Sequence, residues 1–342
     1  MSARRARVVS WWALSVLVLT GNPPADAEGA TRDQAAPAVF KGAARLPIVA
    51  EHRYRLAAKI RPLLFFWIGR DQVGAAHAIW RRGPDGIGFE LLIGSDPAQA
   101  PRRINRWGYI AEEVLGSTAR LIGLMKQSDE ASIEQAAASI AAENQGGPSV
   151  FRAIRGTVDK DEASAAIITL RVARDLTFGD VDSLLELVER TPAPAVRRVL
   201  LPRGTRPGFL TALADLIHRD VAEWGSPGPR RARRPTRSVP YIYNGTLYDL
   251  AIRTSERLHE AQVGRRRYEN VIRARFEIRN RASGAVTDFA LLYGTAGSIA
   301  EIPVHAVYRP RWWLQVELFL EEGNPSASTP RCTTSAGPCW QA

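Results

Sequence analysis

The clearest pattern in the chain is an alternation of apolar and charged side chains between Val271 and Asn280. Every second position is apolar, and arginine or glutamate fills the positions between. The apolar positions are Ile272, Ala274, Phe276 and Ile278. A period of two predicts a β-strand with one buried face and one wet face, which is typical of antiparallel sheets.

Segments near both ends of the chain continue this β pattern. The turn residues Gly83–Gly86 separate two short apolar runs and indicate a hairpin, because Pro and Gly suit consecutive turn positions. Ser283 and Gly284 indicate a second turn. The further strands that we expect are Val73–Arg82, Gly88–Ile93, Val286–Tyr293, Ile302–Tyr308 and Trp312–Leu320.

The middle of the chain carries signals for helices. Ser128 can cap one helix, Thr177–Asp180 has the form of a capping box before a second, and Pro207 fits the first turn of a third that Gly225 ends. We therefore predict an α+β fold, in which the N- and C-terminal strands build a curved antiparallel sheet and a mainly helical middle segment packs against it. Two separate β domains are the alternative.

These patterns divide the chain into seven parts. We expect a signal peptide at 1–27, a flexible leader at 28–48, an N-terminal β part at 49–98, a helical segment at 99–224, a basic Pro-rich linker at 225–238, a C-terminal β part at 239–322 and a flexible tail at 323–342.

The first residues have the three parts of a secretory signal. Arginines precede the apolar run Val8–Leu19, and Ala25–Ala27 form an A-x-A site. The alternative, a membrane anchor, needs about 20 apolar residues. We expect cleavage after Ala27, export to the periplasm or beyond, and no transmembrane span in the mature protein. In an oxidising compartment Cys332 and Cys339 can form a disulfide that closes a short loop in the tail.

The charge of the chain restricts its partners. The 46 basic residues outnumber the 35 acidic ones, which gives a net charge of +11, and nearly all the basic residues are arginine. Basic runs usually indicate nucleic acid, but an exported protein rarely meets it. A lipid or another anionic component of the cell envelope is the partner that we expect, with solvated loops as the alternative.

The closing strand pattern resembles a known type of domain. Phe289, Leu291 and Tyr293, then Ile302–Val304 and Trp312–Leu314, resemble the last strands of uncharacterised exported bacterial domains. Residues 239–321 are similar in outline to periplasmic lipoprotein carriers, whose curved sheet and helical lid enclose an acyl-chain cavity. The whole chain also resembles an uncharacterised exported family without an assigned activity. Neither resemblance assigns a functional residue.

The sequence holds no local catalytic motif: G-x-S-x-G, H-E-x-x-H, the phosphate loop and the dinucleotide fingerprint are all absent. Two cysteines and five scattered histidines predict no metal site, and we expect no cofactor. The most suggestive segment is Gly94–Tyr109, where Asp96 could act as a base or make a turn. Its arginines could clamp an anion or be solvated. They are Arg102, Arg103 and Arg106.

Two function hypotheses remain. The first is a non-enzymatic exported envelope protein that binds an apolar or amphiphilic ligand, or serves in envelope assembly. Trp313, beside a run of arginines, is its further candidate contact. The alternative is a hydrolase or transferase whose site forms only in three dimensions around His77, Asp96 and Glu301. The missing nucleophile and metal motifs favour the first hypothesis.

The signal peptide gives the first testable prediction. The exported protein should begin at Glu28, because the basic region, the apolar run and the A-x-A site coincide there. N-terminal sequencing of the protein from the envelope fraction measures this. A soluble cytoplasmic protein that retains Met1 would contradict the prediction.

Overall fold

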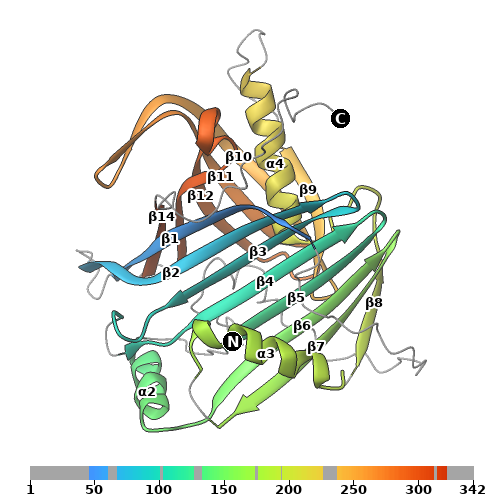
Figure 1. Cartoon of the computed structure of the whole chain (residues 1–342), viewed down its shortest axis with the longest axis vertical. Helices are drawn as coiled ribbons and strands as arrows, with labels where there is room; N and C mark the ends of the chain where they lie inside the picture. Colours follow the sequence, from blue (N-terminus) through green and yellow to red (C-terminus); the bar gives the residue numbers. More distant parts are fainter. Residues whose placement is uncertain are drawn as a thin grey trace, which may run out of the picture.

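A single antiparallel sheet dominates the computed structural model, which describes residues 46–60, 68–100, 103–126, 133–173, 176–193, 195–225, 237–311 and 314–321 (Figure 1). The sheet has fourteen strands within these ranges. They are β1 (Ile48–Ile60), β2 (Ile68–Gly83), β3 (Gly86–Ser95), β4 (Trp107–Leu115), β5 (Thr118–Lys126), β6 (Ser149–Asp159), β7 (Glu162–Val172), β8 (Val196–Leu200), β9 (Arg237–Tyr243), β10 (Thr246–Val263), β11 (Arg266–Asn280), β12 (Val286–Gly294), β13 (Pro303–Arg311) and β14 (Leu314–Leu320).

The order of the strands is almost the order of the sequence. It runs from β8 down to β1 and then from β14 down to β9, so that only β1 and β14 pair across a long distance in sequence. Their register places Tyr54 opposite Leu320 and Ala58 opposite Val316. This one pairing joins an N-terminal half (β1–β8) and a C-terminal half (β9–β14) into one sheet.

The predicted α+β fold with a mainly helical middle segment is wrong, because the described residues form a nearly all-β structure. Residues 99–224 contain β4 to β8 as well as the three helices α2 (Ile133–Asn144), α3 (Val181–Arg190) and α4 (Phe209–Gly225). The misreading has a physical cause: β4 and β5 are buried on both faces over most of their length. A strand buried on both faces carries no alternation of apolar and polar residues, so the sequence lacks the signal of period two.

Helices form in the three predicted places, although Ser128, the predicted cap of the first, lies outside the described residues. Before α3, the backbone N and Oγ1 of Thr177 both donate to Oδ2 of Asp180, at 2.9 and 3.1 Å. Helix α4 ends at Gly225 as expected. Of the helices in the ranges given above, none combines the length and the apolar character needed to cross a membrane.

Several predicted parts fall outside the described residues. These are the signal peptide, nearly all of the leader, most of the basic linker and the tail with Cys332 and Cys339. Their boundaries, and the disulfide, stay predictions.

The two outermost strands of the sheet approach each other through the segment after β8. Arg206 forms an isolated bridge with Tyr241 of β9. Its backbone N donates to the carbonyl of Pro240 at 2.7 Å, and its carbonyl accepts from Ile242 at 3.1 Å. The sheet is therefore curled, and part of the outer edge of β9 is covered.

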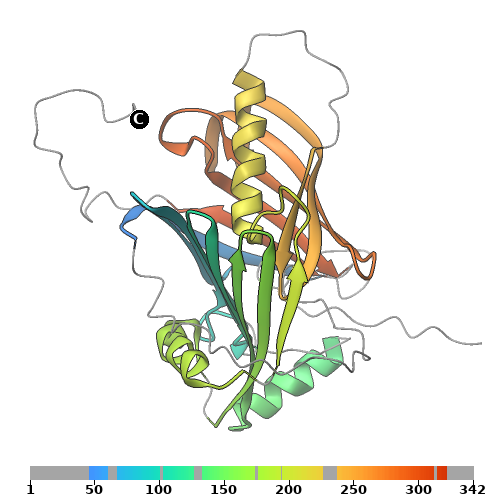
Figure 2. The same cartoon turned by 90° about the vertical axis from the view of Figure 1, so that its right-hand side faces the viewer.

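Helix α4 packs inside this curl, mainly against β9 and β10, as the yellow helix beside the orange strands in Figure 2 shows. Its buried residues Phe209 and Leu216 join the largest hydrophobic cluster, which also holds Phe276. A second cluster lies on the opposite face of the N-terminal half, where Leu184 and Val188 of α3 are buried with residues of β4 to β7. Apolar residues thus cover both faces of the N-terminal half.

A buried carboxylate fixes the start of α4. Oε1 of Glu112, on β4, accepts from the backbone N of Leu210 at 2.7 Å. Oε2 accepts from the backbone N and Oγ1 of Thr211 at 2.8 and 2.6 Å. A carboxylate is favourable there because the first amides of a helix lack partners. Burial raises the pKa of Glu112, and these hydrogen bonds oppose the rise. A Cβ at Gly208 would lie only 2.1 Å from the Glu112 carboxyl carbon, so this close approach needs glycine.

The other end of α4 is held by a second buried acid. Asp220 is 1% exposed. Its Oδ2 accepts from the hydroxyls of Ser255 and Tyr293, both at 2.6 Å, and its Oδ1 accepts from Arg237 at 2.9 Å. These partners lie on β10, β12 and β9. Both ends of the helix are therefore tied to the sheet by hydrogen-bonded carboxylates.

The strand with the strongest alternation gives the second prediction. Phe276 is fully buried and stacks on Phe289 with ring centroids 5.0 Å apart, whereas the side chain of Arg275 is 62% exposed and pairs with Asp288. Phe276→Ala should lower the free energy of unfolding by about 3 to 5 kcal/mol, and Arg275→Ala by about 0 to 1 kcal/mol. Denaturant melts measure both. Equal losses would contradict the register of β11.

Candidate binding site

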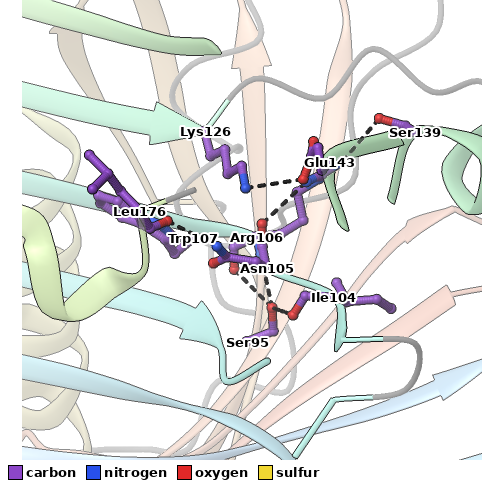
Figure 3. A network of polar contacts seen from close by, with 9 residues as sticks. All are labelled: Ser95, Ile104, Asn105, Arg106, Trp107, Lys126, Ser139, Glu143 and Leu176. Carbon is purple, nitrogen blue, oxygen red and sulfur yellow. Dashed lines mark hydrogen bonds and ion pairs between the residues drawn. The ribbon is translucent and has the colours of Figure 1, made fainter. Parts of the chain in front are cut away.

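The segment that the sequence marked as most suggestive forms a buried polar network (Figure 3). Arg106 is 2% exposed, and its guanidinium lies 2.5 Å from Glu143 on α2 and 3.2 Å from the hydroxyl of Ser139. Lys126, with no exposed surface, approaches the same carboxylate at 3.1 Å. Of the three arginines of the expected anion clamp, Arg106 binds an anion, and that anion is the Glu143 side chain of the protein itself.

The rest of this network holds loops to the sheet. The hydroxyl of Ser95 donates to the carbonyl of Ile104 at 2.7 Å and accepts from the backbone N of Arg106 at 2.9 Å. Asn105 and Trp107 both donate to the carbonyl of Leu176, each at 3.0 Å. These hydrogen bonds join the loop between β3 and β4 to the segment before α3, so the network has a structural role.

Asp96 makes a turn. Its Oδ1 accepts from the backbone N of Ala98 at 2.9 Å and its Oδ2 from Gln99 at 2.8 Å. Arg103 is exposed and has a φ of 56°. Arg102 and Trp313 lie outside the described residues. The structure therefore gives Asp96 local partners within its own turn, and Arg103 does not join Arg106 on Glu143.

The other candidate catalytic residues have separate partners. Nε2 of His77 on β2 lies 2.8 Å from Glu51, and Glu301 lies 2.8 Å from Nδ1 of His218 on α4. The structure does not bring His77, Asp96 and Glu301 together, because each side chain contacts a different part of the chain.

A pocket of about 470 Å³ lies on the outer face of the C-terminal half, the face turned away from α4. One wall is the end of the β10–β11 hairpin, and the others are strands β11 to β13. The lining residues are Ala261, Gln262, Val263, Arg273, Arg275, Asp288, Phe289, Ala290, Leu291, Leu292, His305, Val307 and Arg309.

The hairpin reaches this face because two irregularities bend it. The pairing of β10 with β11 shifts register between Ile252 and Thr254, and Asn270 in β11 has a φ of 50°. Thr295 fixes the second bend, since its backbone N and Oγ1 donate to the carbonyl of Asn270 at 2.9 and 2.7 Å. The hairpin end then packs in a small cluster of buried apolar residues. Its members are Ala261, Val263, Val271, Leu292 and Val304.

The pocket combines an apolar wall with a cationic rim. Arg275 is paired with Asp288 at 2.5 Å. Arg273 is exposed and makes no ion pair within the described ranges. Nε of Arg309 donates to Oε1 of Gln315 at 2.6 Å. Together with His305, these side chains place more positive than negative groups around the pocket.

A buried acid beside the pocket organises two of these bases. Glu317 is 5% exposed. It accepts from Gln315 at 2.7 Å, lies 3.2 Å from Nε2 of His305 and forms an ion pair with Lys59. Burial alone would raise the pKa of Glu317, but hydrogen bonds with His305, Lys59 and Gln315 outweigh burial and lower it to about 2. Through Gln315, the same acid also holds Arg309.

Sequence reasoning missed this site. The alternation in the strand Trp312–Leu320 places Gln315 and Glu317 on the face opposite to Leu318, which the pattern alone would leave in solvent, but they are only 9% and 5% exposed. The signal that was available is the row of arginines on the charged face of β11. The residue pattern does not indicate the bend of the β10–β11 hairpin, and this bend adds the wall that makes the strand face a pocket.

Comparison with known proteins identifies no family. No protein-family model and no curated protein matches the chain. A crystal structure of a "putative lipoprotein" from Parabacteroides distasonis ATCC 8503 is similar over 80% of this chain and 95% of that one, with 11% sequence identity and a TM-score of 0.26. A likeness at this level assigns neither a fold nor a function to the chain.

The low pKa of Glu317 gives the third prediction. Its folded pKa of about 2 lies below the unfolded value of about 4.3. The ionised acid therefore stabilises the fold above about pH 4 and stops doing so as the pH falls toward 2. The stability lost should be about 1 to 2 kcal/mol after allowance for its partial solvation. Denaturant melts at pH 5 and pH 2.5 measure the loss.

Two variants test the assignment to this residue. Glu317→Gln should be less stable than wild type at pH 5 and should lose less on acidification. Glu321→Gln, which changes an exposed acid just after β14, should follow the wild-type profile. Parallel pH profiles for wild type and Glu317→Gln would contradict the prediction.

Proposed function

We propose that this chain is a non-enzymatic exported protein of the cell envelope and that the outer pocket binds a small amphiphile with an anionic head group. The observation that carries the proposal is that one pocket combines an apolar wall with Arg273, an exposed cation that forms no ion pair with any described residue. A lipid or a related envelope component has this chemistry. Export itself rests on the signal sequence.

The dimensions and lining of the pocket support this ligand class. Its volume of about 470 Å³ is within the range of small-molecule sites, about 300 to 1,000 Å³. Ala290, Leu292 and Val307 offer apolar contact to a short alkyl chain, while Arg273 can donate two parallel hydrogen bonds to a carboxylate or phosphate. Besides cations and apolar groups, the described lining includes Gln262, Asp288 and His305 but no hydroxyl or thiol nucleophile, which favours binding over catalysis.

The resemblance to lipoprotein carriers implies an acyl-chain cavity that the curved sheet and its helices enclose. In this chain α4 packs on the inner face of the sheet, the face that carries Phe276. Phe209 of α4 contacts Phe289 and Tyr241, with ring centroids 6.2 and 5.9 Å apart. Since side chains fill this space, the outer face is the better location.

Titration calorimetry with decane-1-sulfonate, an amphiphile with a permanent negative charge, tests the proposal and gives the fourth prediction. Wild type should bind saturably, and Arg273→Ala should raise Kd roughly three- to tenfold, as the loss of one partly solvated charge contact does. Arg279→Ala is the matched control, because this arginine is also exposed on the charged face of β11 but does not line the pocket.

A second variant tests the apolar wall. Ala290→Trp should fill the pocket and abolish binding, while a thermal melt shows whether the variant is folded. The absence of saturable binding to wild type, or equal effects of Arg273→Ala and Arg279→Ala, would contradict the proposed function.

A further inference from the structure

We propose that ligand binding in the outer pocket is coupled to protonation of His305, so that the protein holds an anionic ligand more tightly at pH 5 than at pH 8. The inference rests on the proposed function and adds a mode of regulation to it. Its basis is the position of His305 between the pocket and the buried carboxylate of Glu317.

The surroundings of His305 fix its orientation. Its Nε2 lies 3.2 Å from Oε2 of Glu317, and its ring stacks on Phe319 with centroids 4.7 Å apart. The side chain is 21% exposed, and the residue lines the pocket. The imidazole ring is therefore held at the pocket, where its protonation would add a positive charge next to a bound ligand.

The other charged groups around His305 are carboxylates, a lysine and arginines, which are side-chain types that do not ordinarily titrate between pH 5 and 8. Arginine guanidinium groups stay protonated, and arginines face the pocket from β11 and β13. On β1, Lys59 pairs with Glu317, and Arg55 lies 4.4 Å from the ring centroid of Phe319. On β12, Asp288 is paired with Arg275. Histidine is the side chain whose charge ordinarily changes between pH 5 and 8.

The added charge is not cancelled locally. Glu317 already pairs with Lys59, and with a pKa of about 2 it is ionised throughout this range. Protonation of His305 therefore adds one positive charge to a pocket that already carries Arg273 and Arg309. Binding of an anion offsets the repulsion among these cations. By thermodynamic linkage, protonation strengthens anion binding by the same factor by which the anion strengthens protonation.

The fifth prediction uses decane-1-sulfonate again, because its charge is the same at pH 5 and pH 8 and only the protein titrates. The Kd of wild type should fall roughly three- to tenfold from pH 8 to pH 5 at constant ionic strength. His305→Gln should bind with a Kd that changes less than about twofold over this range. His218→Gln, which alters an exposed histidine paired with Glu301, should keep the wild-type dependence.

A second measurement needs no variant. Calorimetry of wild type at pH 6.5, in two buffers with different ionisation enthalpies, should show uptake of a fraction of one proton per ligand bound. A flat Kd profile or zero proton uptake, with binding retained, would overturn the coupling and leave the proposed function intact. Equal pH dependence in wild type and His305→Gln would assign the coupling to another group. An absence of binding at every pH would instead overturn the proposed function.

Discussion

The contact between Glu112 and the start of α4 is the interaction on which the inner core depends. It places an acid of the N-terminal half, 2% exposed, against the unpaired amides of a helix that packs on the C-terminal half. A buried carboxylate without partners would cost several kcal/mol. The first turn of α4 supplies three donors to this one group, so the carboxylate is satisfied only when the helix is seated. The requirement ties α4 to β4, and through α4 it ties the two halves of the sheet together.

Buried or partly buried acids join distant elements of the chain at several further places. Asp220 fixes the far end of α4, and Glu143 holds α2 to the sheet through Arg106 and Lys126. Glu317 gathers side chains from β1, β13 and β14. In a chain rich in arginine, each of these acids receives several charged or polar donors. Removing one member would leave the others buried and unpaired, which is more costly than losing a surface ion pair.

The two polar clusters considered as functional sites, around Arg106 and around Glu317, differ in whether a pocket lies beside them. The network around Arg106 closes on itself, since Glu143 takes the place of an external anion. The cluster around Glu317 lies beside a pocket, where Arg273 and His305 are positioned to face a ligand. This difference makes the outer face of the C-terminal half, rather than the segment Gly94–Tyr109, the better candidate for function. The bent β10–β11 hairpin is the structural element that makes the difference.

The sequence by itself determined the local elements that carry a strong periodic or capping signal. It predicted the strands from β11 to β14, the β2–β3 hairpin and the three helices, because half-buried strands and capped helices leave their period in the residue pattern. Only the tertiary structure decided that β4 and β5 are strands, since burial on both faces removes that period. It also decided the pairing of β1 with β14 and the partner of Arg106, which depend on contacts between residues far apart in the chain. The pocket also depends on the tertiary structure. The sequence shows its arginines as the charged face of a strand. The wall that the hairpin adds depends on the irregularity between Ile252 and Thr254 and on the positive φ of Asn270.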